Sequence, residues 1–390
     1  MLLGVCLRML DKVPDSPVIV VGGGAAGLSA AAALSRRGID VVVLERDREL
    51  GGTWARRYDR LHLHTVRQFS GLAHFPIPRR YPAYLSRDDV VEYLREYAGH
   101  FRLRVVTGAT VRRIRPRDAV SGRWTVETVD GDAWHARVVV IATGQYRQPI
   151  IPLWPGRESF EGRTVHSSDY TNAMPYAGQR VLVVGAGNSG AEIATDLSDN
   201  GAASVAISVR TAPPIVPRDP FGMPVQSTSI LLSALPAAIS NRLGKTIARF
   251  LLGDLTRYGM PGGEFAPYTT KRIPLIDVGF CEALKRGRVK VRPALERLTR
   301  TDAIFADGTS EPFDAIIAAT GFSTGLESLV DIPGVLDEHS EPRGTSGEAT
   351  AHPGLYFIGF THSLRGHLFE ANRSSRRLAR NVRRYLSTPL

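Results

Sequence analysis

The stretch VIVVGGGAAGLSAAAALSRRGIDVVVLER, residues 18–46, decides the fold of this chain. It begins with the apolar run Val18–Val21, whose β-branched residues are typical of a buried parallel strand. A Gly-x-Gly-x-x-Gly turn follows directly, then a helical segment from Ala25 to Arg37 that ends at Gly38, then a second buried strand at Val41–Leu44. This order predicts a βαβ unit of a doubly wound parallel sheet.

The same stretch predicts a dinucleotide site. Gly22 allows the tight bend, Gly24 lets the backbone approach a pyrophosphate, and Gly27 lets the helix pack close to the strand. The helix N-terminus attracts that phosphate. Glu45 ends the second strand about twenty residues after the glycines, where a carboxylate binds a ribose hydroxyl. A glycine motif alone is weak evidence, whereas the whole unit in order is strong evidence.

Length and composition indicate a globular protein of about two domains. The chain has 390 residues and a net charge of +11, with a mean hydropathy of −0.09. Only five of the 49 basic residues are lysines, and the arginines are widely spread, which favours a solvated surface. We therefore expect no nucleic-acid partner, while peripheral membrane contact stays open.

The cysteine content indicates a reducing, cytoplasmic setting. With only Cys6 and Cys281, the sequence offers no disulfide framework, no zinc cluster and no CxxC pair, and we expect no metal site. Residues 1–10 include Arg8 and have no convincing cleavage site, so we expect a disordered leader. No run is long enough to span a bilayer.

Irregular and antiparallel segments follow the first unit. Gly51–Trp54 places two glycines and an indole where backbone can pass close to a ring system, and the aromatic-rich stretch Tyr58–Pro82 suits a pocket wall. Ser86 is a predicted N-cap for a helix to about Gly99. Three alternating runs then predict an antiparallel layer: Val105–Ile114, Arg123–Val129 and Trp134–Ile141. The last run ends in Ala142-Thr143-Gly144, which suits either a cofactor-side exit from the sheet or a plain tight turn.

A second nucleotide unit follows a proline-rich linker at Gln148–Gly156. A strand at Val181–Val184, a glycine turn, a helix and a strand at Ser204–Val209 repeat the first pattern. This last strand ends in Arg210-Thr211 instead of an acid, a cation and a hydroxyl suited to the 2′-phosphate of NADPH. A chance surface arginine is the alternative.

The rest of the chain predicts an insertion and a return to the first sheet. Residues 212–270 do not resemble a Rossmann core, and we expect one or two helices that cover a substrate entrance or, less favoured, touch a membrane. Ala319-Thr320-Gly321 repeats the earlier Ala-Thr-Gly ending. Leu355–Gly359 predicts a buried strand returning to the first domain, followed by an arginine-rich helix from about Phe369 to Leu386 with a solvated basic face.

One further motif identifies a family. Phe160-x-Gly162-x-x-x-His166-x-x-x-Tyr170 resembles the FxGxxxHxxx(Y/F) signature of flavin-containing monooxygenases. With both glycine turns, the glycine–tryptophan loop and both Ala-Thr-Gly endings, the chain resembles the class B flavin monooxygenases from Val18 to Gly359. Local stretches at 58–64, 185–190, 209–218 and 253–259 are most similar to the plant YUCCA enzymes and their bacterial relatives.

The resemblance implies an α/β fold of two Rossmann-like dinucleotide-binding domains, the second inserted into the first. Residues 1–152 and 325–390 form the FAD domain, and residues 153–324 form the NADPH domain with its insertion at about 212–270. The residues assigned to FAD are Gly22, Gly24, Gly27, Glu45, Gly52 and Trp54. Those assigned to NADPH are Gly185, Gly187, Asn188, Ser189, Gly190, Arg210 and Thr211. Further cofactor contacts are assigned to Thr143, Gly144, Thr320, Gly321 and Gly359.

The resemblance also implies the chemistry. NADPH reduces FAD, oxygen adds to form a flavin hydroperoxide, and a dry pocket protects it until a small substrate arrives. YUCCA-like enzymes convert indole-3-pyruvate to indole-3-acetate. The predicted catalytic residues are His64, Arg67 and His166: His64 stands where many family members carry an asparagine near the flavin, and Arg67 or a histidine of its loop would hold a substrate carboxylate.

Several alternatives stay open at this point. The first alternative is a monooxygenase that acts on amines or sulfides instead of a keto acid. The second is an NADPH oxidase or flavoprotein reductase. A nucleotide-binding protein that acts through its arginines at a membrane or on nucleic acid is a third possibility. His166 has a structural alternative, and the oligomeric state is not predicted.

Overall fold

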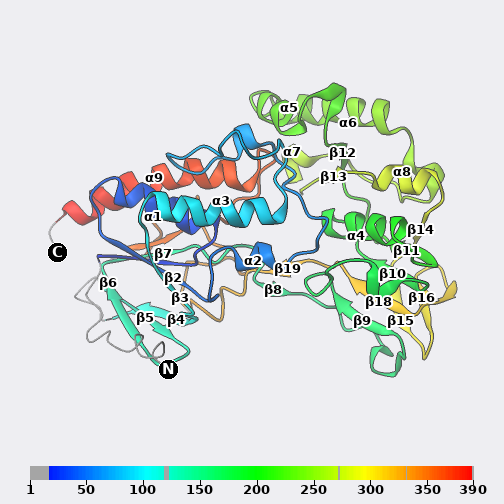
Figure 1. Cartoon of the computed structure of the whole chain (residues 1–390), viewed down its shortest axis with the longest axis horizontal. Helices are drawn as coiled ribbons and strands as arrows, with labels where there is room; N and C mark the ends of the chain where they lie inside the picture. Colours follow the sequence, from blue (N-terminus) through cyan, green and yellow to red (C-terminus); the bar gives the residue numbers. More distant parts are fainter. Residues whose placement is uncertain (1–16, 118–122, 271–272, 331, 389–390) are drawn as a thin grey trace, which may run out of the picture.

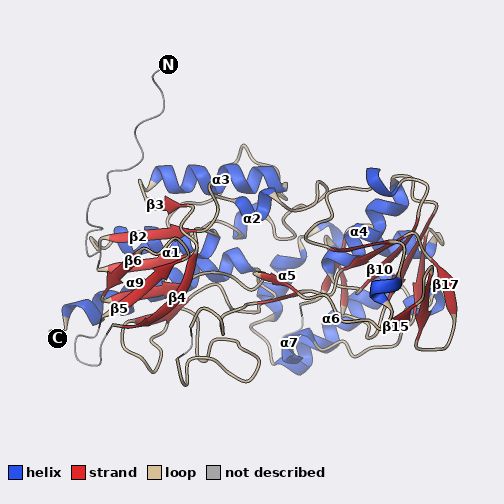
Figure 2. Ribbon diagram, turned by 90° about the horizontal axis from the view of Figure 1, so that it is seen from below, coloured by secondary structure: helices blue, strands red, loops and turns tan. Residues whose placement is uncertain are grey.

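Two parallel sheets lie at opposite ends of an elongated molecule. The computed structural model describes residues 17–117, 123–270, 273–330 and 332–388 (Figure 1). Seen from below, the strands form two separate groups with a narrow connection between them (Figure 2). The predicted leader at residues 1–10 lies outside the described residues.

The first sheet contains five parallel strands within the described part, in the order β20-β7-β1-β2-β3. These are β20 Leu355–Phe357, β7 Val138–Ile141, β1 Val18–Val21, β2 Val41–Glu45 and β3 Arg104–Thr107. Helices α1 (Ala25–Ser35), α3 (Arg87–His100) and α9 (His367–Ser387) cover one side, and the short α2 (Gly52–Ala55) lies beside α3 (Figure 1). The fully buried β-branched side chains of β1 and β7 are those a doubly covered parallel sheet requires.

Helix ends follow the predicted signals. Ser86 forms a capping box with Asp89, whose backbone N–H donates to Ser86 Oγ at 3.1 Å, which confirms the predicted N-cap of α3. α9 buries one face against α1 through Leu378, Ala379 and Val382, while most of its arginines are exposed, as predicted for its basic face.

The predicted antiparallel layer is partly wrong. The antiparallel sheet contains only β4 (Val111–Pro116), β5 (Trp124–Thr128) and β6 (Ala133–Ala136). The run Val105–Ile114 divides between parallel β3 and antiparallel β4, and the run Trp134–Ile141 divides between β6 and parallel β7. Continuous apolar alternation does not reveal where a chain passes from one sheet to another.

The second half repeats this architecture. Its parallel sheet has the order β14-β11-β10-β18-β9, and an antiparallel sheet has the order β15-β16-β17. The parallel strands are β9 Arg163–His166, β10 Arg180–Val184, β11 Ser204–Ser208, β14 Val289–Arg292 and β18 Ala315–Ala318. The antiparallel strands are β15 Leu295–Leu298, β16 Asp302–Phe305 and β17 Ser310–Pro312, and the helices are α4 Asn188–Asp199 and α8 Phe280–Lys285.

Two short strands connect the halves. β8 (Gln148–Pro149) leaves the first sheet and pairs antiparallel with β19 (Phe322–Ser323), which leads back to it (Figure 1). Because β20 rejoins the first sheet after the whole second sheet is complete, the second Rossmann-like unit is inserted into the first, as predicted. The domain boundaries at 152 and 324 stay a prediction.

The insertion forms a helical layer above the second unit (Figure 1). It contains α5 (Val225–Leu232), α6 (Ala237–Leu252) and α7 (Pro267–Thr270), and β12 (Ile215–Pro217) pairs parallel with β13 (Leu275–Asp277) beneath them. Gln226, only 1 % exposed, accepts a bond from Val66 N at 2.9 Å and donates to Arg365 O at 2.5 Å. This side chain joins the insertion to the first unit. Among the described helices, none has the length and apolar character to cross a membrane.

Candidate functional site

The first glycine turn has no room for side chains on its inner side. Gly22 has φ +110°, and a Cβ there would lie 2.5 Å from Ala142 O; a Cβ on Gly27 would lie 1.9 Å from Gly22 O. Gly24 is different, because a Cβ there would meet no atom within 4 Å. The turn therefore packs tightly against the sheet and leaves its outer backbone open at Gly24 and the N-terminus of α1.

An open cavity of about 1110 Å³ lies over this turn. Its lining includes five of the six residues assigned to FAD, namely Gly22, Gly24, Glu45, Gly52 and Trp54, and two of the further cofactor contacts, Thr143 and Gly144. Glu45 sits at the end of β2, where its carboxylate accepts hydrogen bonds from Gly23 N at 2.5 Å and Asp47 N at 2.9 Å. The acid is thus held beside the glycine turn, as a ribose-binding carboxylate would be.

Buried polar atoms without partners in the described structure face this region. The Thr143 hydroxyl and both polar atoms of the Gln145 amide are buried and lack a hydrogen-bond partner. The Gln145 side chain as a whole is only 6 % exposed. Both residues line the cavity. Since buried polar groups are nearly always hydrogen-bonded, these atoms fit a polar cofactor in the cavity. Sequence reasoning missed Gln145, although its place directly after Thr143-Gly144 was a signal.

The glycine–tryptophan loop forms the short helix α2 rather than an irregular loop. Gly51 begins it at φ +82°, and a Cβ on Gly52 would lie 2.4 Å from Asp47 Oδ2. Trp54 is half-buried and lines the cavity. The two glycines therefore bring the indole against the cavity without a steric conflict.

The second glycine turn has the same geometry. Gly185 has φ +107°, with a Cβ position 2.5 Å from Ala319 O, and a Cβ on Gly190 would lie 1.9 Å from Gly185 O. Gly187, like Gly24, faces open space. The two Ala-Thr-Gly endings thus serve the same local purpose, since the alanine carbonyl of each lies against the first glycine of its turn.

Residues around the second turn differ in what their side chains do. Asn188 accepts from Ile276 N at 2.8 Å and donates to Pro274 O at 3.1 Å, so its amide joins the turn to β13. The Ser189 side chain lies next to the Tyr58 hydroxyl. Arg210 and Thr211 are exposed beyond β11, and within the described residues no hydrogen bond or ion pair engages the Arg210 guanidinium.

His64 contacts the second unit. Its Nε2 donates to Glu192 Oε1 on α4 at 2.6 Å, and Glu192 is 3 % exposed. The buried Tyr58 hydroxyl lies close to Glu192, and burial followed by the nearby Glu192 charge raises the tyrosine pKa well above its usual value. A buried polar cluster of Tyr58, His64, Ser189 and Glu192 therefore joins the loop after α2 to the second glycine turn. Nothing in the sequence near residue 64 indicated Glu192.

The other two predicted catalytic residues are engaged in backbone contacts. Arg67 Nη1 donates to Arg79 O at 2.7 Å and also to Tyr81 O, which holds the loop that Arg67 begins. His166 Nε2 donates to Gly321 O at 3.0 Å, while its Nδ1 accepts from Ser168 N at 3.1 Å. Burial lowers the pKa of His166, in agreement with this neutral tautomer.

The remaining predicted residues lie near the connecting strands and the return to the first sheet. Thr320 donates its hydroxyl to Ile150 O, and Gly321 has φ +90°. A Cβ on Gly359 would lie 2.7 Å from Ala26 Cβ, at the start of α1. Tyr146, which lines the large cavity, bonds His367 Nε2 at 3.1 Å, a pair that sequence reasoning missed.

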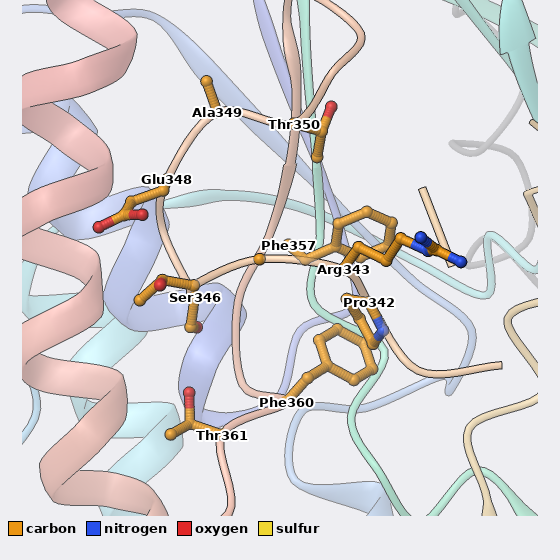
Figure 3. Close-up of a pocket in the computed structure, with 11 residues that line it drawn as sticks. Pro342, Arg343, Ser346, Glu348, Ala349, Thr350, Phe357, Phe360 and Thr361 are labelled. Carbon is orange, nitrogen blue, oxygen red and sulfur yellow. The ribbon is translucent and has the colours of Figure 1, made fainter. Parts of the chain in front are cut away.

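A smaller pocket of about 350 Å³ lies between residues 342–350 and the rings of Phe357 and Phe360 (Figure 3). Glu348 points toward α9, where it pairs with Arg377 at 3.0 Å, and Arg343 points to the opposite side. The pocket is lined by none of the predicted site residues.

Comparisons with known proteins agree with this geometry. The sequence model of the flavin-binding monooxygenase-like family matches residues 15–334. The chain is 37 % identical over 351 residues to indole-3-pyruvate monooxygenase YUCCA1 of Oryza sativa subsp. japonica, covering 88 % of this chain and 86 % of the relative. It is 35 % identical over 381 residues to indole-3-pyruvate monooxygenase YUCCA6 of Arabidopsis thaliana, covering 93 % and 89 %.

Solved structures show the same fold. The flavin-containing monooxygenase from Stenotrophomonas maltophilia superposes with a TM-score of 0.73 at 26 % identity, covering 96 % of this chain and all of that one. An ε-caprolactone-bound cyclohexanone monooxygenase gives a TM-score of 0.71 at 20 % identity, covering 95 % and 88 %, a likeness of fold alone. The predicted family, fold and enzyme class are confirmed: the chain is a flavoprotein oxidoreductase and belongs to the flavin-binding monooxygenase-like family.

Proposed function

We propose that this enzyme uses FAD, NADPH and oxygen to decarboxylate a 2-keto acid oxidatively, with indole-3-pyruvate giving indole-3-acetate. The reaction consumes one oxygen molecule and one NADPH and releases carbon dioxide, NADP⁺ and water. The observation that carries the proposal is a pair of glycine turns with the same geometry, one below the large cavity and one beside exposed Arg210. The choice of substrate is supported by relatives named indole-3-pyruvate monooxygenases.

The first unit would hold FAD. Gly22 and Gly27 keep the turn close to β1 and α1, and the open backbone at Gly24 would meet the pyrophosphate with the helix dipole behind it. Glu45 would bind the ribose, and Trp54 would cover the ring system. Thr143 and Gln145 would donate or accept hydrogen bonds from the cofactor, which would satisfy their buried polar atoms.

The second unit would hold NADPH. Gly187 leaves the backbone open to the pyrophosphate, while Gly185 and Gly190 allow close packing of α4 on β10. The exposed Arg210 guanidinium and Thr211 hydroxyl would bind the 2′-phosphate. Ser189 and Asn188 would position the turn through Tyr58 and β13 rather than contact the nucleotide through their side chains.

The residues of this chain would fix the relative geometry of the two cofactors and exclude water from the reacting atoms. When bound, NADPH and FAD would supply the redox chemistry, a hydride for the flavin and the activation of oxygen. The cluster of Tyr58, His64, Ser189 and Glu192 would hold the two units together, so that the nicotinamide and the flavin meet in a fixed orientation. His166 would act as a positioning residue for Gly321. Arg67 would bind the substrate carboxylate. To do so, its guanidinium would exchange the carbonyl oxygens of Arg79 and Tyr81 for the carboxylate.

Two further features are part of the proposal. The domain boundaries lie at about residues 152 and 324, where the β8 and β19 connections pass between the sheets. A cytoplasmic location is supported by Cys281, which is buried as a free thiol.

The test uses the purified yellow holoenzyme with NADPH in air. NADPH oxidation, peroxide release and product are followed with and without indole-3-pyruvate. We expect the keto acid to accelerate oxidation, suppress peroxide and appear as indole-3-acetate. Acceleration by an amine or sulfide alone would refute the keto-acid assignment but keep the monooxygenase class. Peroxide equal to NADPH under every condition would instead indicate an oxidase.

A further inference from the structure

The insertion exposes an unusual number of large apolar side chains. Seven of them lie between residues 221 and 250: Phe221, Met223, Leu231, Leu235, Ile239, Leu243 and Phe250. We call these residues the apolar face of the insertion. Leu231 belongs to α5, and Ile239, Leu243 and Phe250 belong to α6. Both helices lie at the edge of the molecule, away from the first sheet (Figure 1). Large apolar clusters on a surface mark contact with a partner or a membrane.

Helix α6 presents this face on the side opposite its packed side. Its buried residues are Ser240, Ala248 and Leu252. At 100° per residue, Ile239, Leu243 and Phe250 share a single stripe on the other side of the helix. The stripe therefore points away from the body of the protein, and it is not the inner surface of a cover over the cofactors.

The exposed ring of Phe221 extends the stripe beyond α6, next to Phe250. Phe221 and Phe250 are 64 % and 77 % exposed, yet their ring centroids lie only 6.4 Å apart. Phe221 has φ +53°, a backbone conformation that residues other than glycine rarely adopt. The chain thus holds a large aromatic side chain outward at a conformational cost.

The charge around this face has one sign. Residues 220–253 contain no aspartate or glutamate, and their only charged residues are Arg242, Lys245 and Arg249. All three are exposed on α6. At about 100° per residue, Arg242 and Arg249 lie beside the apolar stripe on one side, and Lys245 lies further round the helix, near Leu252. An amphipathic helix with apolar residues on one face and cations beside them is the pattern that binds anionic lipid surfaces.

We propose that the apolar face of the insertion, with the three cations of α6, docks on the surface of an anionic lipid bilayer. Phe221, Leu243 and Phe250 enter the acyl boundary, while the cations meet lipid phosphates. The charge favours this occupant over a second copy of the chain. A twofold contact would bring two sets of Arg242, Lys245 and Arg249 together on chains of net charge +11.

The test is sedimentation of the holoenzyme with lipid vesicles. One set contains phosphatidylcholine alone, and the other contains equal parts of phosphatidylcholine and phosphatidylglycerol. We expect binding only to the anionic vesicles. Leu243→Ser with Phe250→Ser should abolish it, and each of Arg242→Gln, Lys245→Gln and Arg249→Gln should weaken it about fivefold.

Matched control variants separate this face from general charge. Leu153→Ser removes an exposed apolar side chain elsewhere, and Arg376→Gln with Arg380→Gln removes exposed cations of α9. Neither should change vesicle binding by more than the effect of one α6 cation. Equal losses from the α9 pair, or anionic binding that survives the Leu243 and Phe250 substitutions, would overturn the proposal.

Two further readouts complete the design. All variants replace exposed side chains, so the melting temperature and NADPH oxidation without vesicles should remain those of the parent enzyme. Sedimentation equilibrium without lipid should give the same mass for the parent and for the Leu243→Ser, Phe250→Ser variant. A parent dimer that this variant converts to a monomer would identify a second copy as the occupant and overturn the lipid assignment.

Discussion

Replacing Gly190 by alanine should separate the packing role of the second glycine turn from its nucleotide role. The new Cβ would lie 1.9 Å from Gly185 O and 3.3 Å from Ala319 Cβ. Atoms in contact normally stay about 3.5 Å apart, so α4 must move away from β10 by more than about 1 Å. Overpacking of this kind costs about 1–3 kcal/mol and should lower the melting temperature of a 390-residue chain by about 1–4 °C. The displaced helix N-terminus should also weaken NADPH binding by about a hundredfold.

Gly187→Ala is the matched control in the same turn. Its Cβ would meet no protein atom within 4 Å, and its backbone has φ −78°, which alanine adopts readily. The loss of stability should stay below about 1 kcal/mol, the difference expected between glycine and alanine at a helix N-cap. NADPH binding should still weaken, because the methyl group occupies the space that the pyrophosphate needs.

The assay combines thermal unfolding of the yellow holoenzyme with NADPH titration by fluorescence, and bound FAD is measured by absorbance. Both variants should retain FAD, because the first turn is untouched. An equal fall in melting temperature for both variants would refute the packing argument. Unchanged NADPH affinity in Gly187→Ala would refute the assignment of this turn to the nucleotide.

Four further outcomes follow from the site. Arg210→Ala should raise the NADPH Michaelis constant about 10–100-fold and leave that for NADH unchanged, since it removes one charge-assisted contact; equal rises would argue against a 2′-phosphate contact. His64→Ala should lower the free energy of unfolding by about 1–3 kcal/mol by leaving the buried Glu192 carboxylate short of a donor, and the double variant with Glu192→Leu should recover part of the loss; simple additivity would contradict their coupling. Gln145→Leu should stabilise the FAD-free protein by about 1 kcal/mol yet weaken FAD retention, and calorimetry showing unchanged FAD affinity would remove Gln145 from the site. Burial lowers the pKa of His166, so the unfolded chain binds its proton more readily and stability should fall as the pH drops below about 6.5. This decline in stability, measured as melting temperature against pH, should be shallower in His166→Gln. An unchanged slope would contradict the assignment of the decline to His166.

Much of the fold could be predicted because its signals are local. A strand, a tight turn and a helix within about thirty residues impose their own residue types, and only glycine fits at Gly22 and Gly27. The same signals predicted the second turn and its Ala-Thr-Gly ending. Sequence reasoning was weaker where two sheets share one apolar run, as at residues 105–114, because alternation carries no information about the partner strand.

The roles of individual polar side chains were harder to predict. The motif position of Asn188 predicts a nucleotide contact, which stays a prediction, and the structure adds that its amide is bonded to the backbone at Pro274 and Ile276. Arg67 stays a predicted ligand for a substrate carboxylate, and in the structure it binds backbone carbonyls of its own loop. A polar residue bonds whichever group the fold brings near it, and that group need not be near in sequence.

The sequence by itself determined the two nucleotide-binding units, their order, the insertion within the second unit and the family. These follow from backbone conformations that few residue types permit over short stretches. Only the tertiary structure decided that His64 meets Glu192 across 128 residues, that Gln226 joins the insertion to the first unit, and that Gln145 faces the cavity without a partner. Such pairings arise when distant segments pack together. Local sequence propensity does not indicate which segments will meet, because burial in the folded protein selects the pairs.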